Sequence, residues 1–100
     1  MVESMLTAEQ CLKRLPQSYQ YRVNERREEL KRWFSSGALP KDIIEDAHIL
    51  DWEGGDCAFA YAFLLEGAKK AFAIDSWMDI ASLPEDLKRV EGLAYAKMSI

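Results

Sequence analysis

Nine consecutive residues without a charge, at positions 57–65, constrain the fold more than any other part of the chain. The segment reads CAFAYAFLL, so as a helix it is apolar on every side and must lie in the centre of a core. It is much shorter than the roughly 20 apolar residues that cross a membrane. The segment therefore predicts the buried central element of a soluble domain.

The same segment also has an interpretation as a strand. Its aromatic residues alternate with small residues, and residues 66–69 could form the loop of a hairpin whose second strand is residues 70–75. Six alanines between positions 58 and 73 favour the helix, and Asp56 is a suitable N-cap. We expect a helix, and the alternative is an α+β fold with one β-hairpin around residues 58–75.

Helical spacing of apolar residues extends to the rest of the chain. The clearest helix is predicted over residues 17–35, and Gly37 follows it where a left-handed residue is favoured. Its apolar stripe consists of Tyr19, Val23, Leu30 and Phe34. Further helices are predicted over residues 41–50 and from Pro84 to about Met98.

Two capping boxes mark helix starts, one at residues 7–10 and one at residues 82–85. A chain of 100 residues with 49% hydrophobic content is sufficient for one core and not for two. We therefore expect an all-α fold, a compact single domain of four to five helices over residues 1–100.

The charges are unevenly distributed along the chain. The net charge is −4, but residues 13–32 carry seven cations and three anions, whereas residues 42–56 carry six anions and no Lys or Arg. A predicted helix over residues 41–50 that carries Asp42, Glu45 and Asp46 would repel phosphates, so nucleic acid is an unexpected partner. The acidic segment predicts either pairing within the molecule or a basic partner.

Neither catalysis nor metal binding is indicated by the sequence. His48 is the single histidine, and with Cys11 and Cys57 it cannot complete a zinc site. Gly54 and Gly55 lack the spacing of a dinucleotide-binding loop. We expect no enzyme, no catalytic or metal residues, no cofactor and no small-molecule substrate that the sequence identifies.

The remaining hypothesis is a non-enzymatic protein–protein interaction module that binds a partner or itself through a helical surface. Arg26 falls within the apolar stripe of the helix over residues 17–35, where its side chain must extend its charge to solvent, pair with a carboxylate of residues 42–56 or meet a partner. Trp33 lies on the same side, and Tyr21, which points away, is a further candidate contact.

The alternative function is an acidic inhibitor. It would use the surface of residues 42–56, with Asp42, Glu45 and Asp46 as contacts, to block a basic site that could otherwise hold nucleic acid. The start of the chain shows no signal peptide and there is no membrane segment, so a cytoplasmic location with reduced cysteines is expected.

Overall fold

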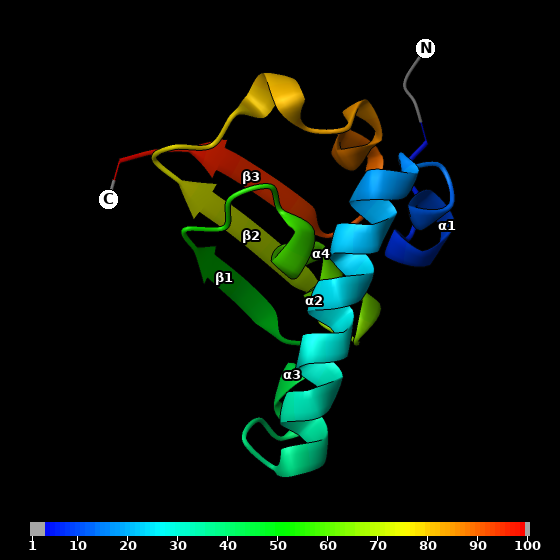
Figure 1. Ribbon diagram of the computed structural model, residues 1–100, viewed down its shortest axis with the longest axis vertical. Helices are drawn as coiled ribbons and strands as arrows, with labels where there is room; N and C mark the ends of the chain where they lie inside the picture. The colour runs from blue at the N-terminus through cyan, green and yellow to red at the C-terminus, as the bar shows by residue number, and fades with distance from the viewer. Residues whose placement is uncertain (1–3, 100) are drawn as a thin grey trace.

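The computed structural model describes residues 4–99, in which four helices, two 3₁₀ helices and three strands follow one another (Figure 1). The elements are α1 (Ala8–Leu12), α2 (Gln17–Ser36), α3 (Lys41–Ile44), β1 (His48–Trp52), α4 (Ala58–Leu65), β2 (Lys70–Asp75), η1 (Ile80–Ser82), η2 (Glu85–Arg89) and β3 (Leu93–Lys97). This is an α+β fold with a three-stranded sheet, so the predicted all-α fold is wrong.

The sheet is parallel throughout, and its strand order is β1-β2-β3. Parallel neighbours require a crossover, and α4 supplies the one between β1 and β2. The favoured helix at residues 58–65 is thus confirmed, while the alternative hairpin is wrong because residues 70–75 pair in parallel with β1.

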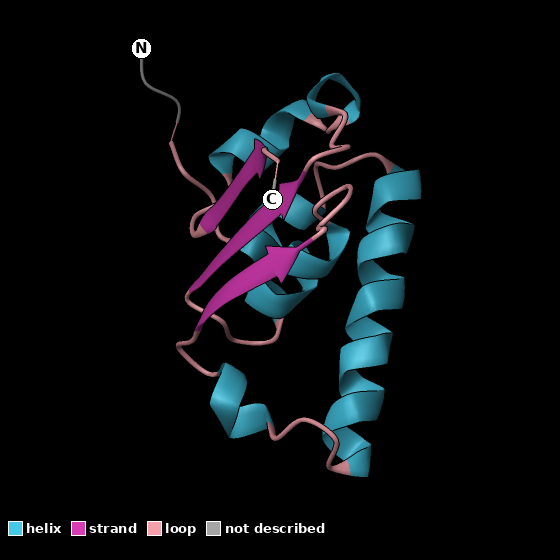
Figure 2. Cartoon of the chain, turned by 90° about the vertical axis from the view of Figure 1, so that its left-hand side faces the viewer, coloured by secondary structure: helices cyan, strands magenta, loops and turns pink. Residues whose placement is uncertain are grey.

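Helices lie on one face of the sheet. Helix α4 contacts all three strands, and α2 packs across α4 on its far side, as Figures 1 and 2 show. Ala71 and Ala73 are buried beneath α4, so the small side chains of β2 let the helix approach the sheet closely. Tyr61 of α4 is fully buried, and its hydroxyl donates to the Ala8 carbonyl oxygen at 2.6 Å, which ties α1 to the core.

The predicted helix over residues 41–50 ends at Ile44, and its last three residues belong to strand β1, which continues to Trp52. Asp46 has a φ of 58°, a left-handed conformation that a helix cannot contain. Residues 48–52 instead pair with β2, a partner more than 20 positions away that no local spacing reveals.

The predicted helix from Pro84 to Met98 is also wrong. The 3₁₀ helix η2 ends at Arg89, and β3 begins at Leu93. Gly92 lies between them with a φ of 86°, and an added Cβ there would lie 2.5 Å from the Lys69 carbonyl oxygen. The second capping box does not form, since the Ser82 hydroxyl donates to the Asp79 carboxylate at 2.5 Å.

The helix predicted over residues 17–35 and the first capping box are confirmed. Helix α2 spans Gln17–Ser36, and Gly37 ends it in the left-handed conformation. The Gln10 backbone N–H donates to the Thr7 hydroxyl at 3.1 Å, and the Thr7 N–H donates to the Gln10 side chain at 3.0 Å. Among residues 4–99, no helix has the length and apolar character needed to span a membrane.

Candidate functional site at the carboxyl end of the sheet

The turn that joins β1 to α4 has an unusual backbone. Glu53, Gly55 and Cys57 have φ values of 62°, 56° and 70°, so every second residue of the turn is left-handed. Glycine adopts this conformation without strain, whereas Glu and Cys are held there at a cost of about 1–3 kcal/mol each. Such strain persists only where the surrounding structure fixes it, and it is concentrated at functional sites.

Gly54 allows this turn to lie close to the neighbouring strand β2. Its N–H donates to the Ile74 carbonyl oxygen at 2.9 Å, and a Cβ added to it would lie 2.7 Å from the Cβ of Ala73. Any side chain at position 54 would therefore push β1 away from β2. The turn is thus fixed directly above the carboxyl ends of both strands.

Asp75, the last residue of β2, connects this turn to the segment that follows β2. Its Oδ2 accepts the Gly55 N–H at 3.0 Å, and its Oδ1 accepts the Trp77 N–H at 2.8 Å. Each carboxylate oxygen keeps a free lone pair, so Asp75 can still accept hydrogen bonds from a ligand.

Asp56 attaches the same turn to α2. Its Oδ2 lies 2.7 Å from Nε of Arg22, and its backbone oxygen accepts the Tyr19 hydroxyl at 2.6 Å. Its Oδ1 accepts the Ala58 N–H at 3.0 Å, which uses one of the free amides at the start of α4. The pairing expected between the basic and acidic segments is therefore made by Arg22, while Arg26 pairs with Glu29 at 3.2 Å.

Asp51 lies on the covered face of β1, close to this turn. Its Oδ2 is buried and has no hydrogen-bond partner. Burial raises the pKa of Asp51, Asp75 and Asp56 raise it further, and Arg26 opposes the shift. The carboxylates therefore make this end of the sheet electronegative.

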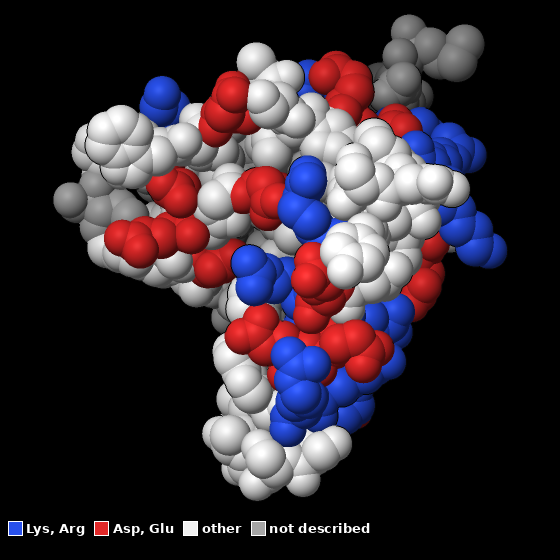
Figure 3. Space-filling model, in the orientation of Figure 1, with Lys and Arg blue, Asp and Glu red and all other residues white. Residues whose placement is uncertain are grey.

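A hollow of about 540 Å³ opens at the same end of the sheet. It is lined by Trp52, Glu53, Asp75, Ser76 and Trp77, and we call it the carboxyl-end hollow. The two indoles are 56% and 91% exposed. The ion pairs described within residues 4–99 do not include Glu53 or Asp75. Figure 3 shows Asp and Glu gathered on this side, where the arrowheads of Figure 1 end.

The face of the sheet opposite the helices is apolar and exposed. Leu50 and Phe72 are paired across β1 and β2, and they are 58% and 41% exposed. Parallel sheets are usually covered on both faces. A second hollow of about 460 Å³ lies at the opposite end of the strands, and we call it the amino-end hollow. Its lining includes His48, Lys70, Phe72 and Ala94.

The partner-binding residues predicted from the sequence do not form one surface. Arg26 and Trp33 come together on Phe59, with the guanidinium 5.7 Å from the ring centre and the two rings 5.7 Å apart. Tyr21 is 66% exposed elsewhere on α2. The acidic residues Asp42, Glu45 and Asp46 are exposed in and after α3. The inhibitor hypothesis stays a prediction that rests on these three side chains.

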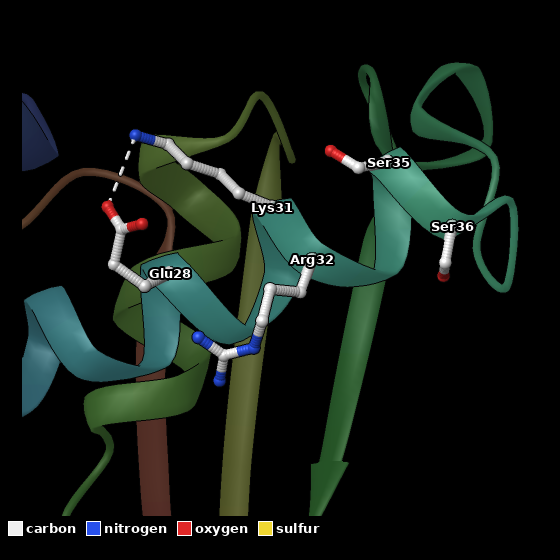
Figure 4. Close-up of a pocket in the computed structure, with 5 residues that line it drawn as sticks. All are labelled: Glu28, Lys31, Arg32, Ser35 and Ser36. Carbon is white, nitrogen blue, oxygen red and sulfur yellow. Dashed lines mark ion pairs between the residues drawn. The ribbon is translucent and has the colours of Figure 1, made fainter.

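Another hollow, of about 460 Å³, lies along the end of α2. Figure 4 shows that its five labelled side chains, Glu28, Lys31, Arg32, Ser35 and Ser36, all come from this one helix. Glu28 and Lys31 form an ion pair at 3.6 Å. The outer surface of one helix with charges of both signs is a solvated surface, so we assign no ligand to it.

The geometry separates the groups that could form a nucleophile–base pair. His48 begins β1 and Cys57 follows its far end, so a strand of five residues, about 16 Å long, lies between them. Burial, with Asp56 and Asp51 nearby, raises the pKa of Cys57 to about 12. Within residues 4–99, no group of three or more His, Cys, Asp or Glu side chains is arranged to hold a metal ion.

Comparison with known protein families, curated proteins and solved structures gives no match. The site is therefore interpreted from its own geometry. Sequence analysis did not select Glu53, Asp75 or Trp77 as site residues, because the left-handed backbone at Glu53 and the contact of Asp75 with Gly55 arise only in the folded chain. One signal was available for Asp75, which comes directly after the apolar residues 71–74.

Proposed function

We propose that the carboxyl-end hollow binds a nucleoside that carries no phosphate. In open parallel α/β sheets, ligands bind outside the carboxyl ends of the strands, usually where the strand order reverses. The order β1-β2-β3 has no reversal, and here the hollow itself marks the place. In dinucleotide-binding folds, a carboxylate about 20 residues after the first turn accepts hydrogen bonds from a ribose hydroxyl. The observation that carries the proposal is the 3.0 Å bond between Asp75 and the Gly55 N–H, 20 positions apart, in a turn with alternating left-handed residues.

The charge and aromatic content of the hollow define the ligand more closely. Glu53 and Asp75 line it, and both would repel a phosphate. The exposed indoles of Trp52 and Trp77 offer surfaces on which a base can stack. A volume of about 540 Å³ lies within the usual range for small-molecule sites. A neutral or cationic nucleoside satisfies these requirements.

The test is an NMR titration of the ¹⁵N-labelled protein with adenosine, 2′-deoxyadenosine and adenosine monophosphate. We expect adenosine to shift the Gly55 and Trp77 amide signals and the other two compounds to bind more weakly. Trp77→Ala should weaken adenosine binding, whereas Asp42→Asn, which removes an exposed carboxylate in α3, should not. Equal binding of the monophosphate, or no shift with adenosine, contradicts the proposal.

A second function is favoured by a different observation, the exposed apolar face of the sheet. Leu50, Trp52 and Phe72 are all more than 40% exposed there, which suits the non-enzymatic interaction module expected from the sequence. We place the contact on this face rather than on a helical surface, because Tyr19, Val23 and Leu30 of α2 are buried. A cytoplasmic location is part of this proposal, and two free, buried cysteines agree with it.

The second function is tested by a photo-crosslinking amino acid, p-benzoylphenylalanine, at position 72 in living cells. The same amino acid at position 21 is the control, since Tyr21 is exposed on α2, away from the sheet. We expect a discrete crosslinked species from position 72 only, identified by mass spectrometry. The same products from both positions, or none from position 72, argue against a binding face.

A further inference from the structure

We infer that the nucleoside in the carboxyl-end hollow carries a positive charge on its base, as a purine alkylated on a ring nitrogen does, and that this base lies between the indoles of Trp52 and Trp77. The inference rests on the proposed nucleoside function and narrows its ligand from neutral or cationic to cationic. Two indoles and two carboxylates line the same hollow, and their arrangement carries the inference.

The two indoles lie on opposite sides of the sheet. Trp52 ends β1 and alternates with the covered residues of that strand, so it has the orientation of Leu50 on the exposed face. Trp77 also lines a smaller hollow, of about 200 Å³, together with Tyr19 and Arg22 of α2 on the helix side. A flat base in the carboxyl-end hollow therefore has one indole on each side.

The carboxylates around the hollow favour a cation. Glu53 and Asp75 line it, and neither belongs to the ion pairs described within residues 4–99. Asp51 and Asp56 lie nearby and add to the negative potential, since Asp56 and Asp75 both raise the pKa of Asp51. A neutral ligand leaves this potential uncompensated, whereas a positive charge is attracted by it.

The cations near this end of the sheet do not line the hollow. Lys97 lies beside Asp75 in the pairing of β2 with β3, but it is not one of the lining residues. Arg22 pairs with Asp56 at 2.7 Å, and Arg26 is paired within α2. Among the described residues that line the hollow, the charged ones are thus both carboxylates.

A charge on the base itself uses both kinds of group. A cation over the face of an indole is attracted by the negative face of the ring, and tryptophan is the aromatic residue that binds cations best. A neutral base gains only stacking from the same two rings. Alkylation of a ring nitrogen places the charge within the plane of the base, where both indoles and both carboxylates act on it.

Two isomeric nucleosides test the charge without changing the size of the ligand. Near neutral pH the base of 1-methyladenosine is a cation, whereas that of N⁶-methyladenosine is neutral. In NMR titrations we expect the first to bind about five- to thirtyfold more tightly than the second. It should shift the indole N–H signals of Trp52 and Trp77, but not that of Trp33, which packs on Phe59.

The outcomes separate this inference from the function on which it rests. Equal Kd values for the two isomers, with adenosine bound at similar strength, overturn the cationic ligand and leave the nucleoside function standing. Absence of binding by all three nucleosides overturns both. A shift of one indole signal alone contradicts the placement of the base between the two rings.

Variants test which groups read the charge. Glu53→Gln keeps the length of the side chain, so the preference for 1-methyladenosine over its isomer should fall about two- to fivefold while the neutral isomer binds as before. Trp52→Leu should lower the same preference. Glu45→Gln is the matched control, because this exposed carboxylate lies before the opposite end of β1. A preference that survives both Glu53→Gln and Trp52→Leu overturns the inference.

Discussion

The two faces of the central strand β2 differ in the size of their side chains, in the reverse of the usual arrangement. On the covered face, β2 presents Ala71 and Ala73 to α4, and both are buried. On the exposed face the same strand presents Phe72, and β1 presents Leu50 and Trp52. The size of an apolar side chain therefore does not indicate which face of this sheet is buried. Close approach of α4 requires small residues in β2, and the larger Phe72 faces outward.

The largest effect should come from adding volume to the covered face. Ala73→Leu places a larger side chain under α4, where Ala73 is fully buried and its Cβ already lies against Gly54. We expect the free energy of unfolding to fall by about 1–3 kcal/mol in urea denaturation. Ala94→Leu makes the same change on the exposed face and should cost less than about 0.5 kcal/mol. Equal losses would show that both faces are packed.

A smaller effect should come from Asp51, the charged residue of the covered face. Its raised pKa means that the folded state binds the proton more tightly than the unfolded state does. The stability from this group is therefore greatest below the ordinary Asp pKa of about 4 and is lost as the pH rises through the folded-state pKa. Asp51→Asn should stabilise the protein at pH about 7, and the gain should shrink toward pH about 4.

Urea denaturation at both pH values measures this gain. Asp42→Asn, at an exposed carboxylate in α3, is the matched control and should change stability little at either pH. A loss of stability in Asp51→Asn at neutral pH would mean that the carboxylate makes a favourable contact in its charged form.

The smallest effect should come from the exposed face itself. Leu50→Thr replaces a side chain that is 58% exposed with a β-branched residue that suits a strand. We expect the free energy of unfolding of the dilute protein to change by no more than about 0.5 kcal/mol. A much larger loss in a concentration-independent measurement would contradict the assignment of this face as free surface.

Local patterns predicted those parts of the fold that neighbouring residues determine. The 3.6-residue spacing of Tyr19 and Val23, the capping box of Thr7 and the position of Gly37 all gave the correct structure. The strands β1 and β3 could not be found in this way. Leu50 and Ala94 fit a helical spacing equally well, and only pairing with β2, a partner distant in sequence, gives them their strand conformation.

The candidate site was missed for a related reason. Its turn is defined by backbone angles at Glu53 and Cys57, residue types that rarely adopt a positive φ. Asp75 gains its position only when β2 lies beside β1. The residues proposed from charge and spacing lie where the two hypotheses placed them, on α2 and in and after α3, but none of them lines the carboxyl-end hollow.

The parallel order of the strands has a consequence for how fast this chain folds. None of the three described strands pairs with another as a hairpin. Pairing of β1 with β2 requires that the segment containing α4 first bring them together, and pairing of β2 with β3 requires the same of the segment containing η1 and η2. Loop closure over these distances costs entropy before any sheet contact compensates for it. Helix α2 can form in microseconds or less, whereas the sheet must form later and more slowly. During that interval the apolar strands are unpaired, and the chain is most exposed to aggregation.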